Sequence, residues 1–265
     1  DFARGRYATD ASIYQMMPHG VVVPESFEDV EATLAFARAE GMAILPRGGG
    51  TSQCGQTVNH ALVIDTSRHL NRILELDVAG RRCLVEPGIV LDELNRQLKP
   101  HGLWFPVDVS TSSRATIGGM AGNNSCGGRS IRYGMMRDNV TAIDAILSDG
   151  SQARFGDLDT TVATGLLADL QPRLLEMGAA HAQDILDGFP KVLRRVGGYN
   201  VDALMPDAMA LRPGGTPGDG INLSHLLVGS EGTLAFSTAI ELKLWPLPAK
   251  KLMGICHFPT FYKAM

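Results

Sequence analysis

Hydrophobic and polar positions follow two different periods along the first part of the chain. Apolar residues at helical spacing between Phe27 and Ala37 predict an amphipathic helix, which Ser26 caps and Gly41 ends. Short apolar runs at 21–23, 42–45 and 61–65 predict strands before and after this helix. The pattern therefore predicts a small sheet with one helix packed against its face.

Two pairs of apolar runs predict β-hairpins. Residues 73–77 and 83–86 flank Ala-Gly-Arg, and residues 141–147 and 152–155 flank Ser-Asp-Gly-Ser. Turn-forming residues between two such runs are typical of a hairpin. Between the hairpins, Leu91, Leu94 and Leu98 share one face of a further predicted helix.

The last part of the chain changes from helical to strand periodicity. Residues 158–189 predict helix, with Pro172 expected to begin a new segment, and residues 212–220 predict a mobile glycine–proline loop. The apolar run 226–228 predicts a short strand. Strict alternation over 234–244 predicts a long strand with one buried face.

The composition is that of an ordinary globular protein and excludes several classes of function. Of the 265 residues 45% are hydrophobic and 20% charged, and the net charge of -4 gives no support for nucleic-acid binding. The four cysteines form no Cys-x-x-Cys pair and the seven histidines lack tight ligand spacing, so no metal site is predicted. No apolar run reaches the ~18 residues of a membrane span, and we expect a cytoplasmic protein or one peripheral to the inner membrane.

The glycines cluster, and the densest cluster follows the predicted strand at 42–45. Arg47 precedes three glycines at 48–50, and Thr51 and Ser52 follow them. Glycines allow successive backbone N–H groups to converge on an anion, hydroxyls add donors, and Arg47 adds positive charge, which together suit a pyrophosphate. A Walker loop is excluded because no lysine follows, and a Rossmann loop because a strand comes next. A flexible surface turn remains the alternative.

A second stretch, residues 106–128, is nearly uncharged and rich in glycine, hydroxyls and carboxamides. Such a composition suits a backbone that lies against a polar ligand. Thr116-Ile117-Gly118-Gly119 predicts the start of a short helix, whose N-terminus would add positive potential near phosphate. The alternative is a solvated linker.

A third stretch, Gly-Ser-Glu-Gly-Thr-Leu at 229–234, leads into the long alternating strand. Backbone N–H groups beside its two glycines could face the carbonyl oxygens of a heterocyclic ring without adding charge. The alternative is a plain β-turn with Glu231 in solvent.

Taken together, the three stretches resemble the flavin-binding domain of the vanillyl-alcohol oxidase and p-cresol methylhydroxylase superfamily. The motifs are Pro-Arg-Gly-Gly-Gly-Thr-Ser, Ala-Thr-Ile-Gly-Gly and Gly-Ser-Glu-Gly-Thr-Leu, which are most similar to the D-lactate, glycolate and D-2-hydroxyglutarate dehydrogenase branch. The resemblance implies an α+β fold with mixed sheets flanked by helices. It implies one FAD-binding lobe at 1–103, a second at 104–248, and the start of a capping region at 249–265.

The resemblance also carries the family's cofactor contacts onto matching positions. In the family the second stretch wraps the flavin from pyrophosphate to ring, although Val109 and Ala235 depart from the usual pattern. The implied FAD-binding residues are Arg47, Gly48, Gly49, Gly50, Thr51, Ser52, Gly55, Pro106, Ser110, Thr116, Gly118, Gly119, Asn124, Gly127, Tyr133, Gly229, Glu231, Gly232 and Thr233.

Other positions bear on how the flavin would be held. Flavin-linking relatives have a histidine where this chain has Thr51, so non-covalent FAD is expected. Arg194 or Arg195 could place positive charge near the flavin N1–O2 edge, or both could pair with acids at the surface. His225 lies close to the third stretch and is expected to be a packed histidine.

The function implied by the resemblance is oxidation of a D-2-hydroxy acid to the 2-keto acid, with hydride transfer to flavin N5. The partners implied are the hydroxy acid, a protein or quinone electron acceptor, and a capping or iron–sulfur domain or subunit outside this chain. No catalytic base is nominated, because in the family it comes from the capping domain. The alternative is a non-catalytic flavin-binding subunit or fragment that needs a partner.

Overall fold

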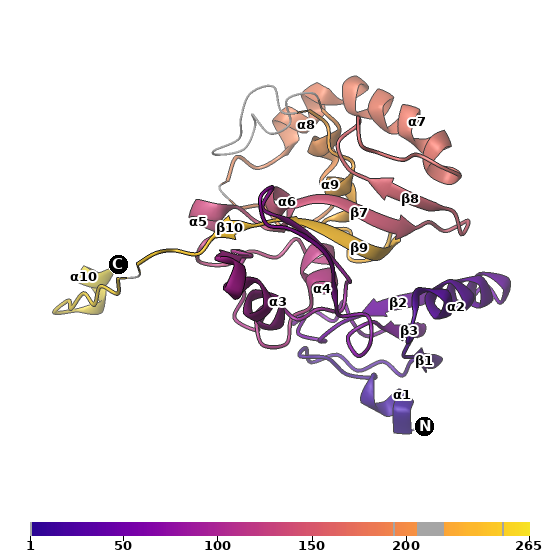
Figure 1. The fold of residues 1–265 in the computed structure, drawn as a ribbon, viewed down its shortest axis with the longest axis horizontal. Coiled ribbons are helices and arrows are strands. Elements are labelled where there is room, and N and C mark those ends of the chain that lie inside the picture. The colour runs from indigo at the N-terminus through magenta and orange to yellow at the C-terminus, as the bar shows by residue number, and fades with distance from the viewer. Residues whose placement is uncertain (1, 193, 206–219, 251) are drawn as a thin grey trace.

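The computed structural model describes residues 2–192, 194–205, 220–250 and 252–265, and it has α+β architecture (Figure 1). One sheet of three strands is parallel and one of five strands is antiparallel. Helices flank both sheets, so the predicted α+β fold with mixed sheets is confirmed. The loop predicted at 212–220 lies outside the described residues except for Gly220.

The small sheet has the strand order β1-β3-β2 and ends at the first glycine stretch. Its strands are β1 (Gly20–Val22), β2 (Ile44–Arg47) and β3 (Leu62–Asp65). Helix α2 (Phe27–Ala39) begins with a capping box in which the Ser26 hydroxyl accepts from the Asp29 N–H, as the sequence predicts. Val30 and Leu34 of α2 pack against the sheet, which fixes where β2 delivers the glycines. A short helix, α1 (Phe2–Arg6), precedes β1.

The large sheet has the strand order β4-β5-β9-β7-β8. Its central strand, β9, is the last of these five in the sequence. Both predicted hairpins are confirmed, and the alternating run forms β9 with bounds slightly inside those expected. The strands are β4 (Ile73–Asp77), β5 (Arg82–Val85), β7 (Val140–Ile146), β8 (Gln152–Phe155) and β9 (Phe236–Lys243). Strands β4 and β5 fall within the lobe expected at 1–103, yet they pair with β9.

Two helical predictions are wrong. Residues 158–165 form no helix, and Pro172 lies inside α7 (Leu166–Ala180) instead of starting a segment. Helix α7 packs on η2 (Val201–Leu204), and this tertiary contact outweighs the backbone hydrogen bond that a proline cannot make. The run expected as a strand at 226–228 contributes to α9 (Ser224–Leu227), because a short, fully buried apolar run has no period that separates helix from strand.

The remaining elements lie between β5 and β7, between β8 and β9, or after β9. They are α3 (Leu91–Leu98), η1 (Lys99–His101), β6 (Leu103–Trp104), α4 (Ile117–Gly122), α5 (Ser130–Tyr133), α6 (Met136–Asn139), α8 (Ala182–Gly188), β10 (Trp245–Pro246) and α10 (Phe261–Ala264). Strands β6 and β10 pair with each other. None of the helices that the structure describes is long and apolar enough to span a bilayer.

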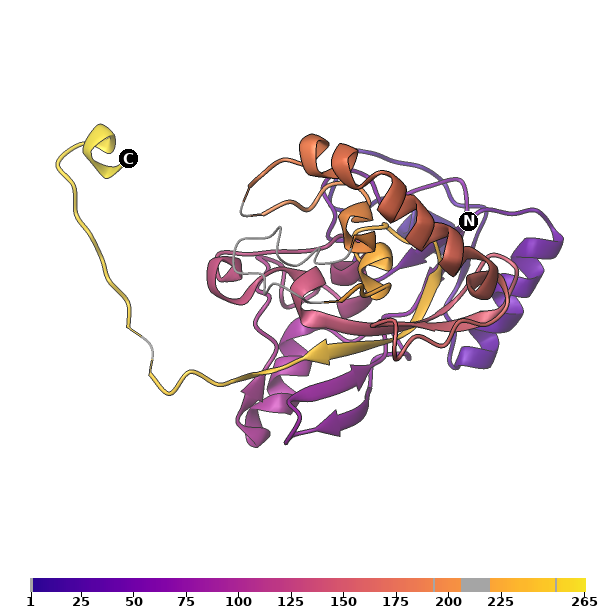
Figure 2. The ribbon, with the colours of Figure 1, turned by 90° about the horizontal axis from the view of Figure 1, so that it is seen from above.

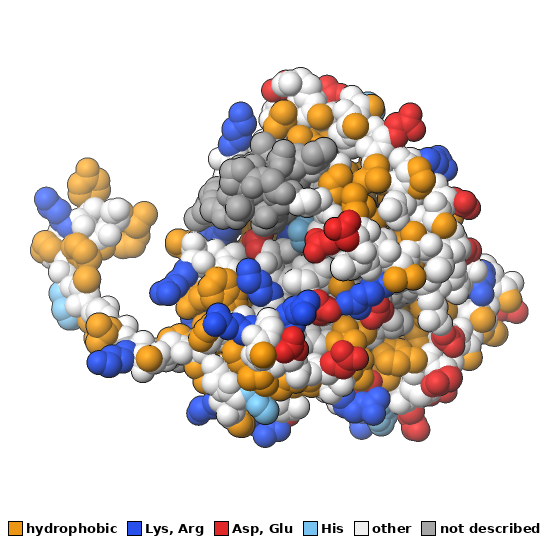
Figure 3. Space-filling model, turned by 45° about the horizontal axis from the view of Figure 1, so that its top comes forward, with side chains coloured by type: hydrophobic (Ala, Val, Ile, Leu, Met, Phe, Trp, Pro, Cys, Tyr) orange, Lys and Arg blue, Asp and Glu red, His pale blue; other side chains and the backbone are white. Residues whose placement is uncertain are grey.

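The chain after β10 leads away from the body, and both views show α10 lying apart from it (Figures 1 and 2). Hydrophobic side chains are exposed along this arm, among them Leu252, Phe261 and Tyr262 (Figure 3). The assignment of 249–265 to the start of a capping region stays a prediction.

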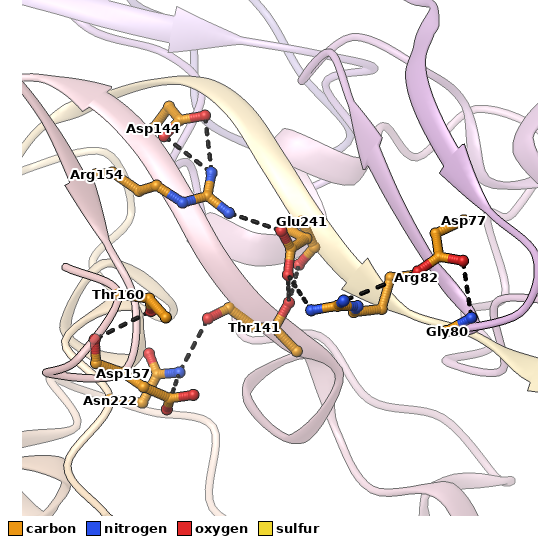
Figure 4. A network of polar contacts seen from close by, with 10 residues as sticks. All are labelled: Asp77, Gly80, Arg82, Thr141, Asp144, Arg154, Asp157, Thr160, Asn222 and Glu241. Atoms are coloured by element: carbon orange, nitrogen blue, oxygen red, sulfur yellow. Dashed lines mark hydrogen bonds and ion pairs between the residues drawn. The ribbon is translucent and has the colours of Figure 1, made fainter. Parts of the chain in front are cut away.

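A polar network ties the strands of the large sheet together on one face (Figure 4). The Arg154 guanidinium contacts Asp144 at 3.1 Å and Glu241 at 2.6 Å, and the Thr141 hydroxyl donates to Glu241 at 2.6 Å. Arg82 approaches the same Glu241 at 3.9 Å. These groups are partly solvated, so each pair contributes at most ~1 kcal/mol, and the network chiefly fixes strand register.

A buried ion pair anchors the segment before α9. The Arg137 guanidinium, 2% exposed, donates to both oxygens of Asp202 at 2.8 Å, and Arg195 donates to Asp202 at 2.6 Å. Arg137 also donates to the Asn200 carboxamide oxygen, and Asn200 in turn donates to the Val228 carbonyl at 2.7 Å. This network connects α6 to the backbone just before the third glycine stretch.

We expect Asp202→Asn to reduce the free energy of unfolding by ~3–5 kcal/mol, because it leaves the buried Arg137 guanidinium and the half-buried Arg195 guanidinium without a compensating charge. Burial alone would raise the pKa of Asp202, but Arg137 and Arg195 reverse this and hold it below its ordinary value. A depressed folded-state pKa gives stability that is present above the unfolded pKa of about 3.9 and is lost as the pH falls through the folded value. Urea unfolding at neutral pH and at about pH 3 measures both effects.

The exposed Asp187 of α8 serves as a matched control. Asp187→Asn should change the free energy of unfolding by no more than ~0.5 kcal/mol at neutral pH. Equal effects of the two substitutions would contradict a structural role for the buried pair.

Candidate functional site

The first glycine stretch offers uncommitted backbone donors. Within the described part of the chain, the N–H groups of residues 49–52 and the hydroxyls of Thr51 and Ser52 have no protein acceptor. Gly50 adopts a left-handed conformation with φ of 61°, which glycine reaches without strain. Successive amides in such a turn form a concave anion-binding nest, so the predicted nest is consistent with this geometry.

The second stretch packs directly on the first, with no room for a side chain between them. A Cβ at Gly48 would lie 2.0 Å from the Thr116 hydroxyl oxygen, and one at Gly49 would lie 2.3 Å from the Arg114 carbonyl oxygen. Both distances are well inside van der Waals contact. These two glycines are therefore required by contact between the stretches, whatever ligand the nest holds.

The expected helix after Thr116 is α4, but its first N–H groups donate to protein acceptors. Ile117 donates to Ile89 at 2.9 Å and Gly118 to Pro87 at 2.7 Å. The Thr116 hydroxyl caps the helix by accepting from the Gly119 N–H. Helix α4 can therefore contribute its dipole near the nest, while direct hydrogen bonds to a ligand must come largely from residues 49–52.

The third stretch is bonded to the end of α4. The Gly229 N–H donates to the Ala121 carbonyl and the Glu231 N–H to the Gly122 carbonyl, both at 2.9 Å. Glu231 itself is left-handed with φ of 54°, a conformation that is unfavourable for a residue with a side chain. Burial raises the pKa of its carboxyl, and a hydrogen bond from Gln56 opposes this shift.

All three stretches line one cavity of about 100 Å³. The predicted residues in its wall are Arg47, Gly48, Ser52, Thr116, Gly118, Gly119, Glu231 and Gly232. Small-molecule pockets usually measure ~300–1,000 Å³, so a dinucleotide would have to extend beyond this cavity or spread its walls. A polar hollow of about 500 Å³ beside Arg72 and Glu93 contains none of the predicted residues.

The other predicted residues do not line this cavity. Asn124 is buried and left-handed, with φ of 47°, and its oxygen accepts from the Arg137 N–H. Tyr133 packs edge-on against Trp104 and Trp245, as a structural aromatic would. The rest are Gly49, Gly50, Thr51, Gly55, Pro106, Ser110, Gly127, Gly229 and Thr233.

Sequence reasoning missed several residues of the cavity wall. Gln56 and Thr57 directly follow the first glycine stretch, Thr66 follows β3, and Pro87 belongs to the turn after β5. Gly122 lies in the second stretch, and its being a glycine in that stretch was the one sequence signal that could have indicated a residue of the wall. The Ala235 methyl also lines the cavity, at the position where this chain departs from the family pattern.

Comparison with known proteins identifies the family. The FAD binding domain family matches residues 18–156, which is more than half of the chain. The chain belongs to this family. Two matches are D-2-hydroxyglutarate dehydrogenases, from Pantoea ananatis at 36% identity and from Escherichia coli at 34%, each over 97% of this chain and 25% of the relative.

A second relative is shorter, so this chain covers a larger share of it. A solved structure shows similarity of fold alone. Glycolate oxidase subunit GlcD of Bacillus subtilis is 29% identical over 92% of this chain and 41% of the relative. A solved alkyldihydroxyacetonephosphate synthase aligns with a TM-score of 0.58 over 87% of this chain and 32% of that one, at 22% identity. The chain thus spans about a quarter of the D-2-hydroxyglutarate dehydrogenases and less than half of the glycolate oxidase subunit.

Candidate charges near the site of this FAD binding domain are committed to protein contacts. The Arg194 side chain donates to the Gly127 carbonyl at 3.0 Å, and Arg195 donates to Asp202 and stacks on the Phe189 ring. His225 is buried, as expected, and burial with the charge of Arg137 lowers its pKa to about 3. Among the described residues, no group of three His, Cys, Asp or Glu side chains could hold a metal ion.

Substitutions at Gly122 and Gly49 distinguish an effect on FAD binding in the cavity from an effect on the stability of the protein. A Cβ at Gly122 would lie 3.8 Å from its nearest neighbour, Glu231 Cα, so Gly122→Ala should fold at least as stably and add a methyl to the cavity wall. We expect FAD affinity to fall about tenfold, since overpacking costs ~1–3 kcal/mol. By contrast, Gly49→Ala should destabilise the FAD-free protein itself.

Thermal unfolding and FAD titration of both variants check this expectation, with Gly188→Ala as control because a Cβ there has no neighbour within 4 Å. Unchanged FAD affinity in Gly122→Ala would place the ligand elsewhere.

Proposed function

We propose that this domain binds one FAD non-covalently along the line where the three glycine stretches meet. The uncommitted N–H groups of residues 49–52, with the hydroxyls of Thr51 and Ser52, supply donors for the pyrophosphate. This set of donors is the observation that carries the proposal, because Gly49 is exposed and residues 50–52 are half-buried, so their amides are accessible to a ligand and no protein acceptor competes for them.

The walls on either side of the nest take the rest of the cofactor. Gly118, Gly119, Gly232 and Ala235 line the same cavity as Gly48 and Ser52 of the first stretch. The family resemblance adds Gly55, Pro106, Ser110, Asn124, Gly127, Tyr133, Gly229 and Thr233 as surrounding contacts. Because threonine occupies position 51, no histidine stands at that point to form a covalent flavin bond.

The reaction we propose for the protein that contains this domain is oxidation of a D-2-hydroxy acid to the 2-keto acid. FAD supplies an acceptor for hydride at N5. The domain binds and orients the cofactor and excludes water from one of its faces. The base, the substrate carboxylate contacts and the electron acceptor, a protein or a quinone, come from outside it, as does any capping or iron–sulfur domain. The names and coverage of the relatives support this division.

A second candidate is a flavin-binding module that does not turn over substrate without a partner. This chain spans less than half of each relative. That coverage favours the second candidate for the isolated chain.

We expect FAD-reconstituted protein to be yellow and to release its flavin into the supernatant when precipitated with acid. Flavin that stays in the pellet would contradict non-covalent binding, and protein that cannot be reconstituted would contradict the FAD site. Adding a D-2-hydroxy acid without oxygen then separates the two candidates. Bleaching of the flavin absorbance indicates a dehydrogenase, and an unchanged spectrum indicates a module that needs a partner.

A further inference from the structure

Arg47 is the one charged residue in the first glycine stretch, and its guanidinium donates to backbone carbonyls of the protein. One guanidinium nitrogen donates to the carbonyls of Tyr7 at 3.2 Å and Thr57 at 2.9 Å, and the other donates to the Thr9 carbonyl at 2.8 Å. The guanidinium also stacks on the Tyr7 ring, 5.3 Å from its centroid. These contacts join the end of β2 to the segment that precedes β1.

The same N-terminal segment holds the glycine stretch at further points. The Ala11 N–H donates to the Gly50 carbonyl at 3.1 Å, and the Thr57 hydroxyl donates to Asp10 at 2.8 Å. A Cβ at Gly55 would lie 2.6 Å from the Tyr14 ring. Residues 7–14 therefore lie along the side of the stretch and restrain both its glycine turn and its far end.

Two carboxylates, those of Asp10 and Asp65, interact electrostatically with the Arg47 guanidinium. Asp10 and Asp65 are close enough to oppose the lowering of the Arg47 pKa that burial causes. Asp65 is itself tied to the segment, since it accepts from the Tyr7 hydroxyl at 2.6 Å. The guanidinium already has three carbonyl acceptors, whereas the neighbouring amides of residues 49–52 have no competing acceptor.

We propose that Arg47 is a positioning residue rather than a phosphate ligand: it fastens residues 7–14 against the glycine stretch and thereby fixes the shape of the nest. This inference rests on the proposed FAD site and deepens it. The pyrophosphate is bound by backbone and hydroxyl donors, and their convergence depends on a segment that does not touch the cofactor. Lysine is not equivalent to arginine here, because one ammonium cannot span three carbonyls in the geometry of a guanidinium fork.

A double-mutant cycle tests this role in the full chain. Arg47→Lys and Asp10→Asn are combined, FAD dissociation constants are measured, and hydrogen exchange of residues 48–56 is followed in the FAD-free protein. We expect Arg47→Lys to weaken FAD at least tenfold and Asp10→Asn several-fold. The double variant should be no weaker than the worse single one, because both act through one contact. Exchange over 48–56 should accelerate in each variant.

The opposite pattern would overturn the proposal. A direct phosphate ligand predicts a mild effect of Arg47→Lys, which keeps the charge, effects that add in the double variant, and unchanged exchange in the FAD-free protein. The exposed Arg173→Lys on α7 is the control and should change neither measurement.

Two further arrangements keep the result decisive. If urea unfolding shows that Asp10→Asn does not fold, Tyr7→Phe replaces it in the cycle, because Tyr7→Phe removes the hydrogen bond from Tyr7 to Asp65. If the wild-type chain binds no FAD, the proposed function fails, while exchange over 48–56 in the FAD-free variants still confirms or contradicts the positioning role.

Discussion

The close approach of two backbones is the constraint on which the site depends. Residues 48 and 49 lie against Thr116 and Arg114 at distances that only glycine allows. The first stretch continues from β2, and the second stretch donates hydrogen bonds to Pro87 and Ile89 in the turn after β5, so the small sheet and the large sheet must meet at this point. The third stretch then reaches the same place because the carbonyls of α4 accept its N–H groups.

Polar groups on both sides of this junction are arranged to hold backbone rather than to contact a ligand. Arg137, Asp202 and Asn200 form a buried network that fixes the backbone before the third stretch. Arg47 does the same for the first stretch through the carbonyls of Tyr7, Thr9 and Thr57. The wall of the cavity combines glycines and hydroxyls with apolar residues such as Leu227 and Phe236, which suits a large cofactor that has both polar and apolar parts.

The local sequence pattern predicts most of the helices and strands, whereas contacts between distant residues determine the strand order and the side-chain contacts. The capping box at Ser26, both hairpins and the alternation that forms β9 could be predicted because each depends on neighbouring residues. The insertion of β9 between β5 and β7 could not, since strand order depends on pairing across more than a hundred residues. The orientation of Arg47 was equally hidden, because its acceptors are backbone carbonyls, which every sequence contains. Glycine clusters indicated the proposed site from the sequence, whereas the contacts of its side chains required the structure.

The most direct test of the account is an amide NMR titration of the isotope-labelled chain with FAD. We expect the resonances of residues 49–52 to move furthest, together with those of 118–122 and 229–233, and to saturate at one FAD per chain. Shifts confined to the hollow beside Arg72 and Glu93, or shifts in one glycine stretch without the other two, would contradict a single cofactor site where the three stretches meet.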